Sequence, residues 1–424
     1  MAKPSILLHL LLLLFNQHSL SLALEASFSG GIGGVSVSGG IQGGFGGTIT
    51  NSPAPPGFQS LKLYRAYRAL QSWKSAITDD PYGVTNTWVG TNVCNYRGVF
   101  CASPLVGSSE LAVAGIDLNH ALLGGTLVSD LSLLSDLSLL HLNTNRFTGT
   151  VPDTFNDFIS LTELDLSNNR FTGPFPSVVL SMPSLIYLDL RFNKFGGVLP
   201  DDLFTSNFDA IFLNNNQFEG PIPLSLGNSP ASVITFANNN FSGDLPATFG
   251  YMGSRVREVL FMNNQLTGCI PEGIGLLSQI QVLDLSFNLF SGHLPDSFSC
   301  LTGIQVLNIA HNEFSGIVPD IVCELRSLAN LTVAFNFFSG LSQECSRLSF
   351  RNVGFDLSGN CIPGKVMQRP PPECNGYQGG FNCIRIPATR PLECQAVGEV
   401  STVEKGTGGV DPRAHGVPGS RPSP

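Results

Sequence analysis

Acidic and aromatic side chains gather in the middle of this 424-residue chain, in a combination typical of molecular recognition. Exposed aromatic rings bury a large apolar area in a partner, and carboxylates around them select a cationic one. Two alternatives remain open: each Asp only hydrogen-bonds its strand neighbours, or Arg191 pairs with Asp189 or Asp165 and lowers the charge. The candidate ligand-binding residues are Glu163, Asp165, Tyr187, Asp189, Arg191, Phe192, Phe212 and Asn214.

The same residues are poor candidates for catalysis. Asp165 and Asp189 would lie on adjacent strands at a spacing that a glycosidase can use. However, the histidines are scattered, and no Ser or Cys has a base at a convincing offset. The cysteines form no C-x-x-C pair beside histidines, as a zinc site would require. We therefore expect no enzymatic activity, no metal and no cofactor.

A repeat explains how these side chains are positioned. An asparagine returns every 23 to 25 residues in a frame close to L-x-x-L-x-L-x-x-N-x-F-x-G-x-x-P, and Ala121 replaces it in the first unit. Such a period predicts a solenoid of about 11 stacked coils over residues 111–364, whose L-x-L triplets form a parallel sheet on a concave face. The repeated asparagines are Asn145, Asn169, Asn193, Asn216, Asn239, Asn264, Asn288, Asn312, Asn336 and Asn360.

The fixed positions of the repeat have structural explanations. The Asn amide can satisfy backbone groups of its own and the neighbouring coil inside a buried turn. The Phe two residues later predicts a stacked core, the Gly allows a sharp bend, and the Pro fixes an extended segment on the outer side. The candidate binding residues fall instead at outward positions of the inner strands, where they would face a ligand.

The regions outside the repeats predict a secreted protein. A Lys and an apolar run before Ser21-Leu22-Ala23 are typical of a signal peptide, and no second apolar stretch is long enough for a membrane anchor. We expect a helix over 58–78 that covers the first repeat. The expected segments are 1–23 signal peptide, 24–57 flexible Gly- and Pro-rich segment, 58–110 N-terminal cap, 365–394 C-terminal cap and 395–424 disordered tail.

Ten cysteines indicate disulfides formed in an oxidising compartment. Solenoid ends expose apolar core, so disulfide-stapled caps there have a physical purpose. Connectivity stays open, and Cys269 and Cys300 have no obvious place. The cysteines expected in the two caps are Cys94, Cys101, Cys323, Cys345, Cys361, Cys374, Cys383 and Cys394.

Charge and glycosylation motifs limit the partners. The net charge of −9 disfavours nucleic acid, whose phosphates need clustered Lys and Arg, and is compatible with a basic peptide. Sequons at Asn240 and Asn330 predict N-linked glycans on an extracellular protein.

Several segments resemble one family closely. The turn N-x-F-x-G-x-x-P is similar to plant-specific leucine-rich repeats, and finer matches point to leucine-rich repeat extensins. The segments that resemble this family are residues 66–77, 93–101, 188–193, 209–214 and 360–363.

The resemblance implies a non-catalytic protein of the cell wall that regulates wall formation and growth. It implies binding of basic, cysteine-rich peptides of the rapid alkalinisation factor type, and dimerisation. The family's long Ser-Pro tail, which locks into the wall, has only Pro370-Pro371-Pro372 as a counterpart here. The chain is also similar to polygalacturonase inhibitors, so an inhibitor-like defence protein is the alternative.

Overall fold

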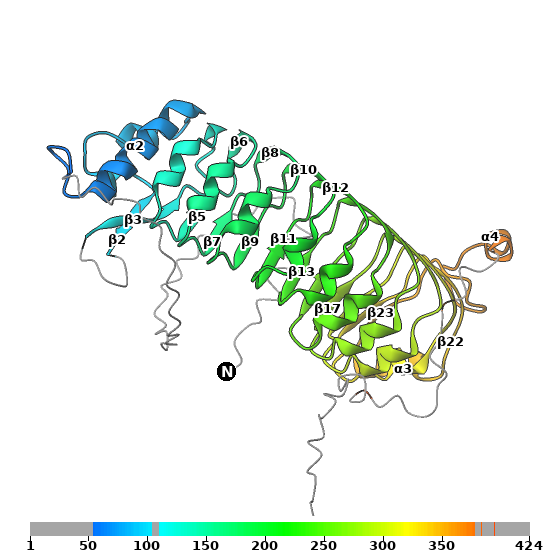
Figure 1. Cartoon of the computed structure of the whole chain (residues 1–424). Helices are drawn as coiled ribbons and strands as arrows, with labels where there is room; N and C mark the ends of the chain where they lie inside the picture. The colour runs from blue at the N-terminus through cyan, green and yellow to red at the C-terminus, as the bar shows by residue number, and fades with distance from the viewer. Residues whose placement is uncertain (1–53, 104–109, 378–382, 384–393, 395–424) are drawn as a thin grey trace, which may run out of the picture. The chain divides into compact units, whose positions relative to one another are not determined.

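The structure is a computed structural model that describes residues 54–103, 110–377, 383 and 394. The expected signal peptide, most of the Gly- and Pro-rich segment and the expected disordered tail lie outside the described residues. Within them, short strands form two sheets that run side by side along a stack of coils (Figure 1).

The inner sheet is built from the L-x-L triplets, as the repeat predicts. Eleven of its twelve strands pair in parallel, and β2 pairs antiparallel with β3 at the N-terminal edge. Its strands in spatial order are β2 (Val99–Ala102), β3 (Ala112–Asp117), β5 (Leu139–His141), β7 (Glu163–Asp165), β9 (Tyr187–Asp189), β11 (Ala210–Phe212), β13 (Val233–Thr235), β15 (Glu258–Leu260), β17 (Val282–Asp284), β19 (Val306–Asn308), β21 (Asn330–Thr332) and β23 (Gly354–Asp356).

A second sheet, which the sequence analysis did not predict, follows the repeated asparagines. Its N-terminal strand β1 is antiparallel to β4, and the remaining neighbours pair in parallel. Its strands are β1 (Ile77–Asp79), β4 (Gly124–Thr126), β6 (Arg146–Gly149), β8 (Arg170–Gly173), β10 (Lys194–Gly197), β12 (Gln217–Gly220), β14 (Asn240–Asp244), β16 (Gln265–Gly268), β18 (Leu289–Gly292), β20 (Glu313–Val318) and β22 (Phe337–Leu341).

Short helices complete the chain. Seven of the fourteen in the described residues are short 3₁₀ helices that begin directly after a repeat Pro, which is their N-cap residue and has a fixed φ. They are α2 (Leu61–Ala76), η1 (Thr85–Thr87), η2 (Val93–Asn95), η3 (Ser129–Leu133), η4 (Asp153–Asp157), η5 (Ser177–Ser181), η6 (Asp201–Phe204), η7 (Leu224–Asn228), η8 (Ala247–Met252), η9 (Glu272–Leu276), η10 (Asp296–Cys300), α3 (Asp320–Cys323), η11 (Glu344–Arg351) and α4 (Pro371–Gly376).

The asparagines link each coil to the next. Asn169 donates from Nδ2 to the carbonyls of Leu166 in its own coil (3.1 Å) and Leu142 in the coil before (2.8 Å). Its Oδ1 accepts the N–H of Phe147 at 3.0 Å. Because a buried unpaired backbone group is costly, this one side chain sets how successive coils stack.

The repeat phenylalanines stack between the two sheets. Phe147 and Phe171 have ring centroids 6.4 Å apart, and Phe171 and Phe195 follow at 6.1 Å. Helix α2 begins at the N-cap Ser60 and places Trp73 5.7 Å from Phe147, so the cap covers the first ring of the stack. Burying one such ring stabilises the fold by roughly 1.5–3 kcal/mol.

The disulfides extend beyond the caps. Cys94–Cys101, Cys323–Cys345 and Cys361–Cys374 join near neighbours, as stapled caps require. Cys383 and Cys394 instead pair with Cys269 and Cys300, over separations of 114 and 94 residues. The connectivity that the sequence left open thus bonds the last two cysteines to earlier repeats, where Cys269 and Cys300 find their partners.

Candidate functional site

The register of the inner sheet brings the predicted binding residues together. Glu163 on β7 pairs with Tyr187 on β9, and Asp165 pairs with Asp189. Asp189 in turn pairs with Phe212 on β11. Because strands of successive coils pair here without a shift in register, residues about 24 positions apart become direct neighbours.

Tyr187, Asp189, Arg191 and Phe212 form one interlocked cluster. The Arg191 Nε lies 2.8 Å from Asp189 Oδ2, and its guanidinium stands 5.0 Å from the centre of the Phe212 ring. The Tyr187 and Phe212 rings lie 5.4 Å apart, and the Tyr187 hydroxyl donates to Asp189 at 3.4 Å. Tyr187 is half-buried, whereas Phe212 is only 6% exposed, so the expectation of an exposed Phe212 is corrected: this ring packs under Arg191 and Tyr187. The cluster therefore offers the Tyr187 ring beside a neutralised ion pair.

Asp189 does not contribute a free carboxylate. Its side chain is buried, and burial raises its pKa to about 7, although the Arg191 charge opposes that shift. An expectation of three exposed acids in one patch therefore needs correction, because Arg191 and Tyr187 occupy the Asp189 oxygens. The pairing that the sequence left open is Arg191 with Asp189.

Asp165 shows why Asp recurs in these strands. Its Oδ1 accepts the backbone N–H of Ser167 at 2.9 Å, and Asp284 does the same for Ser286 and Asp117 for Asn119. The Asp thus closes a small turn at the end of its strand. One oxygen is structural, while Asp165 remains half-exposed.

Glu163 is paired with a histidine that was not among the predicted site residues. The His141 Nε2 lies 3.0 Å from Glu163 Oε2, and the Glu163 side chain is 46% exposed. Because the carboxylate side of this pair is accessible to solvent, the pair contributes little to stability, and Glu163 can exchange His141 for a cation of a partner.

Phe192 and Asn214 lie outside the interlocked cluster. Phe192 directly precedes the ladder residue Asn193 and has φ 54°. The Asn214 amide donates to Asn215 at 2.8 Å, and its oxygen accepts from Thr235 at 2.7 Å. The buried Asn214 therefore organises the sheet surface.

A second aromatic group was missed at the position that Phe192 occupies in its own repeat. The rings of Phe287 and His311 stack at 4.0 Å, and those of His311 and Phe335 at 4.3 Å. The two phenylalanines are 47% and 44% exposed. All three residues have φ near 53°, a conformation that costs about 1–2 kcal/mol for a non-glycine residue. The sequence signal that indicates this group is the recurrence of an aromatic residue at the same position of consecutive repeats.

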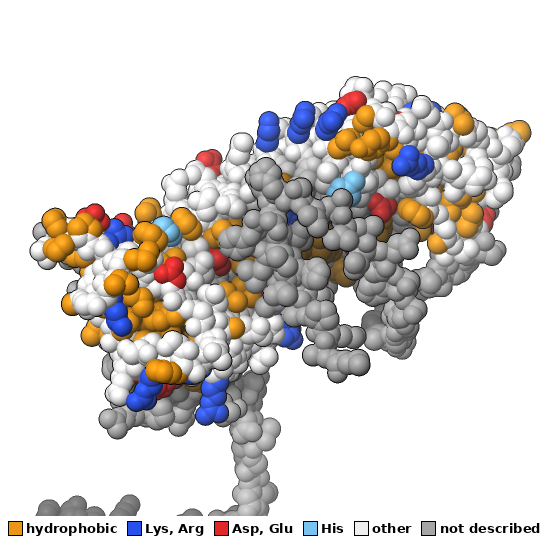
Figure 2. Space-filling view, turned by 180° about the vertical axis from the view of Figure 1, so that it is seen from behind, with side chains coloured by type: hydrophobic (Ala, Val, Ile, Leu, Met, Phe, Trp, Pro, Cys, Tyr) orange, Lys and Arg blue, Asp and Glu red, His pale blue; other side chains and the backbone are white. Residues whose placement is uncertain are grey.

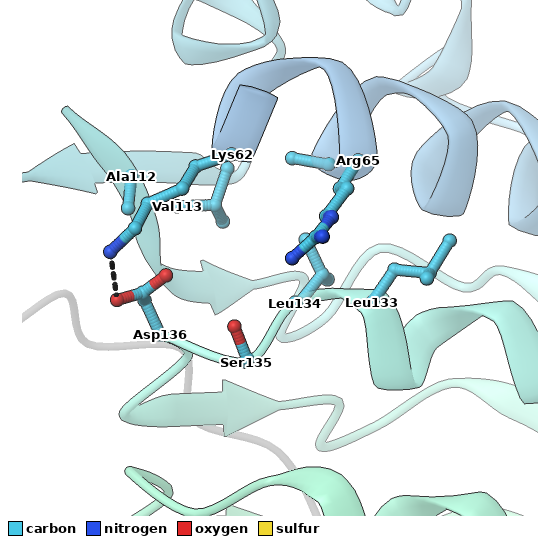
Figure 3. A pocket seen from close by; sticks show the side chains of 9 residues that line it. Lys62, Arg65, Ala112, Val113, Leu133, Leu134, Ser135 and Asp136 are labelled. Carbon is cyan, nitrogen blue, oxygen red and sulfur yellow. Dashed lines mark hydrogen bonds and ion pairs between the residues drawn. The ribbon is translucent and has the colours of Figure 1, made fainter. Parts of the chain in front are cut away.

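Two hollows are found among the described residues, and neither encloses a large volume. A cavity of about 40 Å³ lies between α2 and the first coils, and the Lys62 Nζ–Asp136 Oδ1 ion pair at 2.7 Å spans one side (Figure 3). It can hold little more than one water molecule. A shallow hollow of about 500 Å³ near Thr302 and Glu324 is open to solvent.

Both predicted glycosylation sites are accessible. Asn240 begins β14 on the second sheet and Asn330 begins β21 on the inner sheet, and both are exposed. The Asn330 oxygen accepts from Thr332 at 3.0 Å within the sequon. The described residues contain no group of three metal-ligating side chains and no helix suited to crossing a bilayer.

The fold and surface define a leucine-rich repeat protein. Models described as leucine rich repeat match residues 135–195, 279–301 and 303–325, and a leucine rich repeat N-terminal domain matches 66–102. Leucine-rich repeat extensin-like protein 6 of Arabidopsis thaliana is 52% identical over 347 residues, which cover 82% of this chain and 71% of the relative. The chain belongs to the leucine-rich repeat extensin-like family.

Other family members are matched over a smaller share of their length. Leucine-rich repeat extensin-like protein 7 of Arabidopsis thaliana is 59% identical over 54% of this chain and 53% of the relative. Protein 2 of the same series is 51% identical over 80% of this chain, but the chain spans only 42% of that relative.

Solved plant proteins share the fold. The Arabidopsis receptor kinase HAESA, in complex with the peptide hormone IDA and the co-receptor SERK1, is 25% identical with a TM-score of 0.57, covering 70% of this chain and 54% of that one. A PEPR1–AtPEP1 structure gives 27% identity and a TM-score of 0.63, covering 70% and 42%. A plant ice-binding protein gives 26% and 0.56, covering 71% and 97%.

Proposed function

We propose that this protein is secreted to the cell wall, binds a basic, cysteine-rich peptide of the rapid alkalinisation factor type on its inner sheet, and regulates wall formation and growth. The observation that carries the proposal is the cluster of Tyr187, Asp189, Arg191 and Phe212, with Glu163 and Asp165 beside it. Plant proteins of the same fold, PEPR1 solved with AtPEP1 and HAESA solved with the peptide hormone IDA, support a peptide as the ligand.

The chemistry of the cluster divides its roles. Tyr187 provides ring surface that the buried Phe212 and Arg191 hold in place, so little side-chain entropy is lost on binding. The carboxylates of Glu163 and Asp165 attract cations of the peptide, which speeds association and makes it sensitive to salt. Binding of this kind needs no reacting group, so the proposal includes no enzymatic step. Dimerisation is a further part of it and is measured by analytical ultracentrifugation.

Calorimetric titration with a folded basic cysteine-rich peptide tests the proposal. We expect the double substitution Glu163→Lys with Asp165→Lys to weaken binding at least tenfold, because it places two like charges in the path of the peptide. Asp189 is left intact, since it is buried against Arg191 and its replacement would disturb the fold.

The matched control is Glu219→Lys with Glu313→Lys, which makes the same change in net charge at two exposed positions of the second sheet. It should bind as the unmodified protein does. Equal loss in both double variants, or no binding by the unmodified protein, would sink the proposal. N-glycosylation at Asn240 and Asn330 is checked by the mass change on enzymatic deglycosylation.

A further inference from the structure

Three adjacent strands of the second sheet each begin with a basic residue. Arg146, Arg170 and Lys194 open β6, β8 and β10, at the same place in three consecutive repeats. We call these three residues the basic row. An evenly spaced row of Lys and Arg side chains is visible along one rim of the molecule in Figure 2.

The basic row repeats at the spacing of the coils. The phenylalanines that directly follow the three cations, Phe147, Phe171 and Phe195, have ring centroids 6.4 and 6.1 Å apart. The backbone positions that carry the three cations therefore have a similar spacing along the stack. Their long side chains can adjust to a partner whose charges recur several ångströms apart.

The charge of the basic row is largely uncompensated. Arg146 has an ion pair with Asp79 at 2.5 Å, which leaves its side chain 41% exposed. Within the described part of the chain, neither Arg170 nor Lys194 has an ion-pair partner, and both are exposed. Glu219, at the outward position of β12, is the nearest acid along the sheet beyond Lys194. Three successive cations are unusual in a chain of net charge −9.

The surface around the basic row is mostly polar, and its exposed apolar side chains are single ones: Val198 directly follows β10, and Leu289 opens β18 further along the sheet. The exposed hydroxyl residues Thr148 and Thr172 lie two positions after the cations on the same face of β6 and β8. The first positions of the next strands are the exposed amides Gln217, Asn240 and Gln265. Hydroxyls and amides can donate to and accept from sugar hydroxyls.

The composition of this face discriminates between classes of anionic partner. Protein interfaces depend on buried aromatic anchors, and single-stranded nucleic acids need stacking rings. The outward positions of β6, β8 and β10 carry no aromatic side chain. A linear polymer of uronic acid residues presents one carboxylate per ring and hydroxyls between them. That pattern is complementary to one cation per coil flanked by hydroxyls and amides.

We propose that the basic row binds an anionic polysaccharide built of uronic acid residues, laid along the stack across β6, β8 and β10. The same coils present Tyr187 and Phe212 on the inner sheet, so a peptide and a polysaccharide can be held at once on different faces. An N-glycan on Asn240 would lie in the continuation of the row on β14 and end the polysaccharide track there.

The test measures binding of the full-length protein to polygalacturonate, with the fully methyl-esterified polymer as the uncharged match. We expect binding only to the charged polymer, falling as salt is added. The substitution Arg170→Gln with Lys194→Gln should weaken it about tenfold, since two of the three cations that pair with carboxylates of the polymer are lost. The thermal unfolding midpoint should not change, because both side chains are exposed.

The control Arg255→Gln with Arg326→Gln removes the same charge from two exposed positions off the second sheet and should bind normally. Equal weakening in both double variants would overturn the proposal, as would equal binding of the esterified polymer. Equally tight binding of single-stranded DNA or dextran sulfate would also overturn it, by showing a general attraction to polyanions. Peptide titration on the Arg170→Gln, Lys194→Gln variant separates this site from the inner sheet.

Discussion

At the scale of single residues, one side chain often serves the fold and the surface together. Asp165 closes a turn with one oxygen and keeps the group half-exposed, whereas Asp189 is fully used by Arg191 and Tyr187. The ladder asparagines serve only the fold, because their amides are spent on backbone groups of two coils. Recognition therefore depends on side chains at outward positions that the turns leave available.

The prediction at this scale concerns Asn169. Replacing it with Ala removes bonds to Leu142, Leu166 and Ser167 and leaves the Phe147 N–H unpaired. We expect a loss of about 3 kcal/mol or more in the free energy of unfolding, measured by urea denaturation. Thr172→Ala, at an exposed position of β8, is the control and should cost under about 0.5 kcal/mol. A loss below about 1 kcal/mol for Asn169→Ala would contradict the role of the ladder.

At the scale of elements, the N-terminal cap closes the first end of the stack, where a repeat alone would leave the core and the edges of both sheets uncovered. Helix α2 covers the first phenylalanine with Trp73, while β1 and β2 pair antiparallel with the first strands of the two sheets. The loop after α2 is organised by Asp80, whose carboxylate accepts from the backbone of Val84 at 2.9 Å and Thr85 at 2.8 Å.

Asp80 gives a pH prediction for the cap. Burial acts to raise its pKa, but the bonds from Thr85 and Val84 outweigh it and hold the pKa below the usual 3.8. A lowered pKa stabilises the fold above pH 3.8, and that contribution is lost as the pH falls through the folded value. The stability difference between the unmodified protein and Asp80→Asn should therefore be full at pH 6 and shrink below about pH 4. A stability difference that grows as the pH falls would contradict this prediction.

Periodic elements were predictable from sequence, and contacts between coils were only partly so. The eleven parallel inner strands, the asparagine ladder and the helix near 58–78 follow from regular spacing. The second sheet was missed because N-x-F-x-G contains a glycine bend and no clear alternation. The Cys269–Cys383 and Cys300–Cys394 bonds join distant segments, so no local pattern indicates them. The burial of Asp189 depends on Arg191 and Phe212 meeting it across the register.

At the scale of the whole molecule, the stacked phenylalanines lie between the two sheets and so separate the surfaces that the sheets present. The inner sheet presents rings and carboxylates over β7, β9 and β11, and the second sheet presents cations over β6, β8 and β10. A surface made from neighbouring coils is already formed in the free protein, so ligand binding should leave the backbone of the solenoid unchanged. Each proposed ligand can therefore be tested while the other surface remains intact.

Hydrogen–deuterium exchange of the protein with and without a bound basic cysteine-rich peptide tests the central claim most directly. Residues in and after β7, β9 and β11 should exchange more slowly in the complex, because a ligand over Tyr187 and Phe212 limits opening of these strands. The second sheet and α2 should exchange as before. Protection confined to the second sheet or to the cap, with β7 to β11 unchanged, would contradict a peptide site on the inner sheet.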